Sequence, residues 1–115
     1  MPVEVDAGAL AEVATAVWRL RNKLRNTEDG AGMTRYVRGV EDALAGAGVE
    51  TRQYDGTAFD SGLRIRVLAF EPTEGLAREE IIETVRPAVL LNGDLLRMGE
   101  VIVGTPPVAP VEEQA

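Results

Sequence analysis

The chain contains no cysteine and no histidine, and only 4% of its 115 residues are aromatic. Without cysteine it can form neither disulfides nor thiolate metal sites, and without histidine it lacks imidazole ligands and the usual general base. Carboxylates and lysine remain as possible catalytic groups, but the acidic pairs are adjacent in sequence and face different ways, so none forms an acid–base dyad. We therefore expect no catalytic residue, no metal and no cofactor, and the chain is not expected to be an enzyme. Aromatic side chains bury the largest area each, so this core must be aliphatic and thin.

Negative charge predominates, because 12 Lys and Arg stand against 19 Asp and Glu, which gives a net charge of −7. Nucleic-acid binding depends on basic side chains that displace counterions, so this balance argues against a nucleic-acid partner. No apolar run approaches the roughly 20 residues that cross a membrane, and no secretory signal pattern follows Met1. We expect one cytoplasmic domain that binds neither nucleic acid nor membrane.

Two amphipathic helices are predicted within residues 9–48, after a lead-in over residues 1–8 that ends near the potential N-cap Asp6. A loop rich in helix-breaking residues separates them, and Gly48 suits the left-handed conformation that ends a helix. Each helix carries a narrow apolar stripe with a spacing of three and four. The stripe residues are Leu10, Val13, Val17, Leu20 and Leu24 in the first helix and Met33, Val37, Val40 and Leu44 in the second.

A hairpin with one stripe per helix cannot enclose a core alone, whereas two copies can form a short four-helix bundle. We therefore expect a homodimer with the stripe residues at its interface. The alternative is that both stripes pack against the β half of the same chain. Gly39 interrupts the second helix and indicates either close approach of another backbone or simple tolerance.

Residues 49–104 predict a small, mostly antiparallel β-domain, which makes the fold class α+β. Residues 63–70 alternate as a half-buried strand does, and Asn92-Gly93 is typical of a type I′ hairpin turn. Residues 76–85 fit either a helix or a strand. The proline-rich residues 105–115 predict a disordered tail.

Three motifs resemble the head region of the GrpE-type nucleotide exchange factors, and the likeness spans about residues 10–104. Gly48-Val49-Glu50 leaves the second helix as the family's Gly-Val-x does. The stretch 56–61 is similar to the family's G-x-x-[FL]-D-P. The stretch 91–103 is similar to its ending, L-x-G-x-[LV]-[LI]-R-x-A-x-V-x-V.

This resemblance implies a homodimeric co-chaperone in which a four-helix bundle carries two β-domains. One β-domain binds the ATPase domain of a DnaK-type chaperone and favours its open conformation, which promotes ADP release without a catalytic residue. We expect Arg97 to be structural or to form a salt bridge. The partner-binding residues implied by position are Phe59, Ser61 and Leu63 on one loop edge, Asn92, Gly93 and Asp94 at the hairpin tip, and Val103 on the last strand.

The chain also departs from the family pattern. We expect at most a short helix where the family has a long paired helix, and Arg64-Ile65-Arg66-Val67 stands where the family has H-E-A-V. These departures favour an alternative, a GrpE-like dimeric adaptor or scaffold without exchange activity. A third, weaker interpretation is a monomeric α+β domain with an unrelated enzymatic role.

Overall fold

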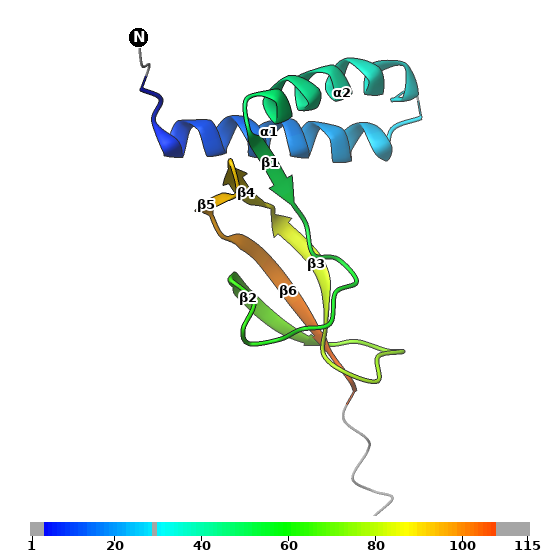
Figure 1. Cartoon of the computed structure of the whole chain (residues 1–115). Coiled ribbons are helices and arrows are strands. Elements are labelled where there is room, and N and C mark those ends of the chain that lie inside the picture. The colour runs from blue at the N-terminus through cyan, green and yellow to red at the C-terminus, as the bar shows by residue number, and fades with distance from the viewer. Residues whose placement is uncertain (1–3, 29, 108–115) are drawn as a thin grey trace, which may run out of the picture.

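The computed structural model of the chain describes residues 4–28 and 30–107 and has an α+β architecture (Figure 1). Two helices lie side by side as a hairpin, and a narrower β half projects from one side of it (Figure 1). The elements are α1 (Ala7–Arg25), α2 (Ala31–Gly46), β1 (Val49–Arg52), β2 (Ile65–Pro72), β3 (Glu80–Arg86), β4 (Ala88–Leu91), β5 (Asp94–Arg97) and β6 (Gly99–Thr105). The predicted fold class is confirmed at this level.

The ends of the helical hairpin follow from specific capping residues. The Asp6 carboxylate accepts a hydrogen bond from the Ala9 backbone N–H at 2.8 Å, which satisfies one of the free donors at the start of α1. Gly48, which follows the C-cap of α2, has a φ of +89°. This is the left-handed conformation that the sequence predicts there, and it turns the chain from α2 into β1.

The strands form two three-stranded sheets rather than one. The first has the order β1-β4-β5 and is antiparallel throughout. The second has the order β2-β6-β3, in which the central β6 is antiparallel to β3 and parallel to β2. The parallel pair could not be predicted from local pattern, because its strands are joined by a long crossover rather than a tight turn.

The structure resolves the ambiguous segment 76–85, since β3 occupies Glu80–Arg86. Pro87 lies between β3 and β4, where the chain passes from one sheet to the other, and no ladder hydrogen bond is required of it. The predicted hairpin turn is confirmed, because Asn92 and Gly93 both have positive φ, 51° and 88°.

The predicted alternation of residues 63–70 holds for only the first part of β2. Ile65 is buried and Val67 is half-buried, but a bulge between Val67 and Ala69 shifts the register against β6. A bulge inserts an extra residue and breaks the period of two. Ala69, which the alternation places inside, is therefore exposed.

Two small aliphatic clusters form the core. The first joins α1 to the β1-β4-β5 sheet, and the second lines one face of the β2-β6-β3 sheet. The buried members are Ala11, Ala14, Val49 and Val89 in the first cluster and Ile65, Ile81, Val101 and Val103 in the second. Neither cluster contains a buried aromatic ring, as the composition predicts.

The ends of the chain differ from the predicted boundaries in two respects. Helix α1 begins at Ala7, two residues before the predicted start, and β6 extends to Thr105, whose carbonyl accepts a hydrogen bond from the Thr73 N–H at 2.8 Å. Thr105 therefore belongs to the β half rather than the tail. Residues 1–3 of the predicted lead-in and 108–115 of the predicted tail lie outside the described residues.

Candidate interaction surfaces

Helix α1 buries a different face from the one its large apolar residues predict. Its buried residues are Ala11, Ala14, Thr15 and Trp18, and the indole Nε1 of Trp18 donates a hydrogen bond to Gln53 Oε1 at 2.9 Å. Small side chains let the helix lie close to the sheet, but they add little to a hydrophobic pattern. That is why the sequence pattern missed this stripe.

Three of the predicted dimer-interface residues are buried or half-buried within the single chain. Val37 is buried, and Leu10 and Leu44 are half-buried against the first core cluster. Leu10 and Leu44 thus pack partly against the chain's own β half, in the manner of the alternative that the sequence left open, and the dimer interface stays a prediction. Val17 and Leu24 are half-buried as well.

The remaining stripe residues stay open to solvent. Val13, Leu20, Met33 and Val40, together with Tyr36, are between 46% and 59% exposed. We call these five residues the helical apolar face. Val13 and Leu20 are seven residues apart on α1, and the other three are spaced by three and four on α2, so each set lies along one side of its helix.

Gly39 lies among these residues of α2 and has open space around it. A Cβ built on Gly39 would meet no atom within 4 Å in the protomer. No backbone of the described chain therefore approaches it closely, and within one protomer the glycine is simply tolerated. Close approach by a second copy stays a prediction.

Phe59 and Leu63, from the first predicted partner-binding group, pack against the second core cluster and are half-buried. The Phe59 ring stands edge-to-face against Phe70, with centroids 5.8 Å apart, and the Phe59 N–H donates to the Glu79 carbonyl at 3.0 Å. Ser61 is exposed. This segment thus carries an exposed serine between two apolar residues that pack on the core.

The second predicted group lies at the tip of the β4–β5 hairpin, where Asn92, Gly93 and Asp94 are all exposed. The Asn92 N–H donates to the Gly48 carbonyl at 2.8 Å, so the tip is tied to the end of α2. Val103 is different, because it is 0% exposed in the second core cluster and cannot touch a partner directly. The first group therefore lies in the segment between β1 and β2, beside the second sheet, whereas the second group lies at the tip of the first sheet.

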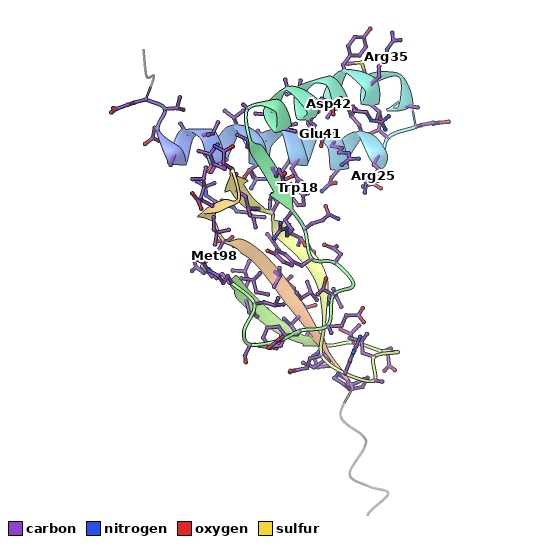
Figure 2. The ribbon with its side chains drawn as sticks, in the orientation of Figure 1. Trp18, Arg25, Arg35, Glu41, Asp42 and Met98 are labelled. Atoms are coloured by element: carbon purple, nitrogen blue, oxygen red, sulfur yellow. The ribbon has the colours of Figure 1, made fainter. Side chains whose placement is uncertain are left out.

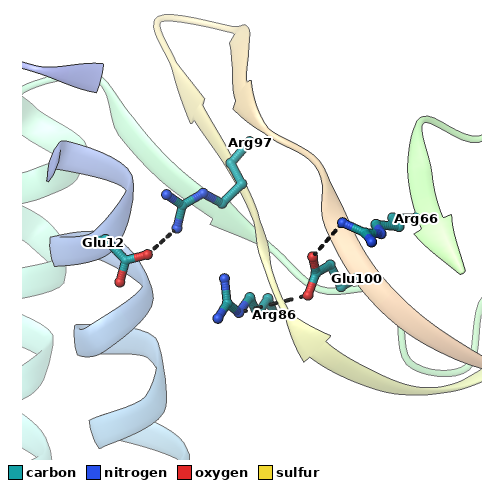
Figure 3. Close-up of polar contacts among 5 residues, drawn as sticks. All are labelled: Glu12, Arg66, Arg86, Arg97 and Glu100. Atoms are coloured by element: carbon teal, nitrogen blue, oxygen red, sulfur yellow. Dashed lines mark hydrogen bonds and ion pairs between the residues drawn. The ribbon is translucent and has the colours of Figure 1, made fainter. Parts of the chain in front are cut away.

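Two ion-pair systems fix the β half (Figure 3). Arg97 on β5 donates to Glu12 on α1 at 2.6 Å, which confirms the structural role expected for this arginine. The hydrogen bond from Arg97 and its positive charge lower the pKa of Glu12. Glu100 on β6 lies between Arg66 and Arg86 at 3.7 and 3.8 Å and thereby connects all three strands of the second sheet.

A groove of about 400 Å³ lies between the two helices and β1, and sequence reasoning missed it. Trp18 and Val49 contribute to its apolar lining, while Arg21, Glu41 and Asp42 contribute charged groups. Arg21 and Glu41 form an ion pair at 3.5 Å across the hairpin. Among residues 4–28 and 30–107, no group of three or more acidic side chains is arranged to hold a metal ion.

No protein-family model matches this sequence, and no curated protein matches it either. The likeness to the GrpE-type factors therefore rests on three motifs whose positions the structure now defines. Gly48-Val49-Glu50 turns from α2 into β1, residues 56–61 run beside β3, and residues 91–103 form the hairpin tip, β5 and most of β6. All three belong to the β half or to its junction with the helices.

Proposed function

We propose that the chain is a GrpE-like homodimeric co-chaperone that binds the ATPase domain of a DnaK-type chaperone and promotes ADP release. The observation that carries this proposal is the helical apolar face, which the protomer's own β half leaves uncovered. Large apolar side chains grouped on one surface are typical of a protein–protein interface. Two hairpins that pack through these faces form a four-helix bundle from which two β halves project.

The exchange activity needs no catalytic group. A protein that binds the open conformation of an ATPase more tightly than the ADP-bound closed one shifts the population towards the open state, and nucleotide leaves faster. The β half suits this role because ion pairs hold its strands and its junction with α1 together. The exposed residues available for contact are Ser61, Asn92, Gly93 and Asp94. Phe59 and Leu63 pack on the second core cluster and so anchor the segment that carries Ser61.

The proposed partners are a second copy of the chain and the chaperone ATPase, with neither nucleic acid nor membrane, and the proposed location is the cytoplasm. Across residues 4–28 and 30–107, neither helix has the length and apolar character needed to span a bilayer. The net charge of −7 also disfavours phosphate backbones as ligands.

Release of a fluorescent ADP analogue from the DnaK-type protein of the same source tests this function. We expect the full chain to accelerate release in a concentration-dependent manner, with its effect saturating as the complex forms. A charge change at the exposed hairpin tip, Asp94→Arg, should weaken the effect, whereas Glu74→Arg, at an exposed turn residue, should not. Unchanged ADP release together with no detectable binding would reject the proposal.

The second candidate is a dimeric adaptor that binds without accelerating release. One observation favours it: the exposed candidate residues are divided between the segment before β2 and the β4–β5 hairpin tip, and Val103 is buried, so the contact that each group offers is small. A small contact can bind the ATPase domain without shifting it to the open conformation. Binding with an unchanged ADP release rate is the result that this candidate requires.

A further inference from the structure

The turn end of the helical hairpin, residues 19–38, is positively charged, unlike the rest of the chain. It contains six Lys and Arg and two Asp and Glu, a net charge of +4, so the remaining residues carry −11 of the total of −7. Four of the cations end α1 and two begin α2. They are Arg19, Arg21, Lys23, Arg25, Arg35 and Arg38.

Most of these cations are exposed to solvent. Five of the six are exposed and Arg21 is half-buried. Of these six cations, only Arg21 forms an ion pair with a residue in 4–28 or 30–107, namely Glu41. Arg35 and Arg25 lie at the same end of the hairpin in Figure 2. The Arg35 guanidinium lies over the Tyr36 ring, 4.9 Å from its centroid, and donates to the Tyr36 hydroxyl at 3.1 Å.

We propose that this turn end is an electrostatic docking surface for a compact acidic patch on a partner protein. The inference rests on the proposed function, from which the partner is the chaperone ATPase domain. It adds a contact made by the helices to the contacts made by the β half. No residue of the turn end belongs to the β-half groups that the motifs indicate.

The charge distribution favours a compact protein patch over an extended polyanion. Charges in physiological salt act over about 8 Å, so a small acidic patch at the turn end interacts with the +4 region alone. A membrane or a nucleic acid presents negative charge over a wide area, and the total charge of −7 disfavours such an extended polyanion. The cations also surround the end of two helices, since Arg19 and Lys23 share one side of α1 while Arg35 and Arg38 lie on α2.

Such a surface acts mainly on the association rate. Opposite charges raise the frequency of productive encounters and orient the partners before short-range contacts form, and salt weakens this effect. The turn end should therefore control how fast the ATPase binds, while the β half controls how long it stays bound.

Stopped-flow binding of the full chain to the nucleotide-free ATPase domain, at 50 and 300 mM NaCl, tests the inference. The variant Arg25→Glu/Arg35→Glu reverses two exposed cations of the turn end. Arg52→Glu/Arg78→Glu changes the total charge equally at two exposed positions of the β half and serves as the matched control. Far-ultraviolet circular dichroism checks that both variants fold.

We expect the turn-end variant to associate about tenfold more slowly than wild type at 50 mM NaCl, with a much smaller difference at 300 mM and little change in dissociation rate. The control should stay within about threefold of wild type at both salt concentrations. Equal effects of the two variants would overturn the inference and leave the proposed function standing. Wild-type protein that does not bind the ATPase would instead reject the proposed function, and with it this inference.

Two further experiments test whether the turn end instead binds a membrane or a nucleic acid. Wild-type protein is sedimented with vesicles of phosphatidylcholine containing phosphatidylserine, and is titrated into a fluorescent single-stranded oligonucleotide. We expect no binding in either experiment at 150 mM NaCl. Binding to either probe that Arg25→Glu/Arg35→Glu abolishes would assign the surface to a polyanion and overturn the inference.

Discussion

Arg97 on β5 and Glu12 on α1 join the β half to the helical hairpin through a hydrogen-bonded ion pair of 2.6 Å between Nη1 and Oε1. The two residues are 85 positions apart in sequence. The pair lies where the β half joins α1, so the protonation state of Glu12 affects how firmly the β half is held to the helical hairpin.

The pair predicts a pH dependence of stability in the acid range. Because Arg97 lowers the pKa of Glu12 below its ordinary value of 4.5, the ionised carboxylate stabilises the fold above that value. This stabilisation is lost as the pH falls through the lowered pKa of the folded state. In urea unfolding, Glu12→Gln should reduce the free energy of unfolding at pH 7 and make little difference at pH 2.

Glu74→Gln is the control for this experiment, since Glu74 is exposed and belongs to no ion pair among the described residues. Its effect on stability should be small at both pH values. An equal loss of stability for Glu12→Gln at pH 7 and pH 2 would show that the carboxylate contributes through packing rather than charge.

A buried hydroxyl on α1 predicts a stabilising substitution. Thr15 is 1% exposed, and its Oγ1 has no hydrogen-bond partner among the described residues. Burying an unpaired polar group costs free energy, and valine has the same shape without the hydroxyl. Thr15→Val should therefore raise the free energy of unfolding by about 1 kcal/mol, measured by urea denaturation.

Thr84→Val is the matched comparison, because Thr84 is also buried but its hydroxyl is used. It accepts from the Tyr54 N–H at 2.9 Å and donates to the Asp55 carboxylate. Removing it leaves the half-buried Tyr54 N–H without its partner and takes a hydrogen bond from the Asp55 carboxylate, so this variant should lose about 1–3 kcal/mol. The same sign of change at both positions would contradict the hydrogen-bond assignment at one of them.

Local signals in the sequence were sufficient where the structure depends on neighbouring residues. Asp6, Gly48 and Asn92-Gly93 each act through a cap or a turn completed within a few positions, and all were predicted correctly. The parallel pairing of β2 with β6 and the Trp18–Gln53 hydrogen bond join distant segments, and no local period encodes them.

The candidate sites also combine features that local patterns predict with features that only tertiary packing decides. Hydrophobic spacing identified side chains that lie along the helices, but it could not say which of them the β half covers. Val37 is buried and Leu10 is half-buried against the first core cluster, while Leu20 is exposed. The burial of Val103 likewise depends on the position of β6 in the middle of its sheet.

Two glycines with similar backbone angles predict different costs of substitution. Gly48 and Gly56 have φ values of +89° and +83°, so alanine is strained at both. A Cβ at Gly48 would also collide with the Asn92 amide, whereas one at Gly56 would meet nothing within 4 Å. Gly56→Ala should cost about 1 kcal/mol and Gly48→Ala about 2–3 kcal/mol in thermal or urea unfolding.

The difference between the two variants isolates the contact between the helix end and the hairpin tip. If both lose the same stability, the Asn92 side chain moves aside without cost, and the tip is held to the end of α2 by the backbone hydrogen bond from Asn92 to Gly48 and not by side-chain packing. In that case, any change in ADP release caused by Gly48→Ala would come from backbone strain at the turn and not from the contact with Asn92.

The strongest test of the assembly is a charge placed in the helical apolar face. Leu20 is 50% exposed in the protomer, so Leu20→Asp should leave the monomer folded. In a four-helix bundle the same side chain is buried against the second copy, where an unpaired carboxylate is strongly disfavoured. We expect sedimentation velocity to show a dimer for the wild type and a monomer for Leu20→Asp at equal concentration. Leu68→Asp, which alters a leucine of similar exposure (46%) on β2, should remain dimeric. A monomeric wild type, or dissociation by Leu68→Asp alone, would show that the helical apolar face is not the dimer interface.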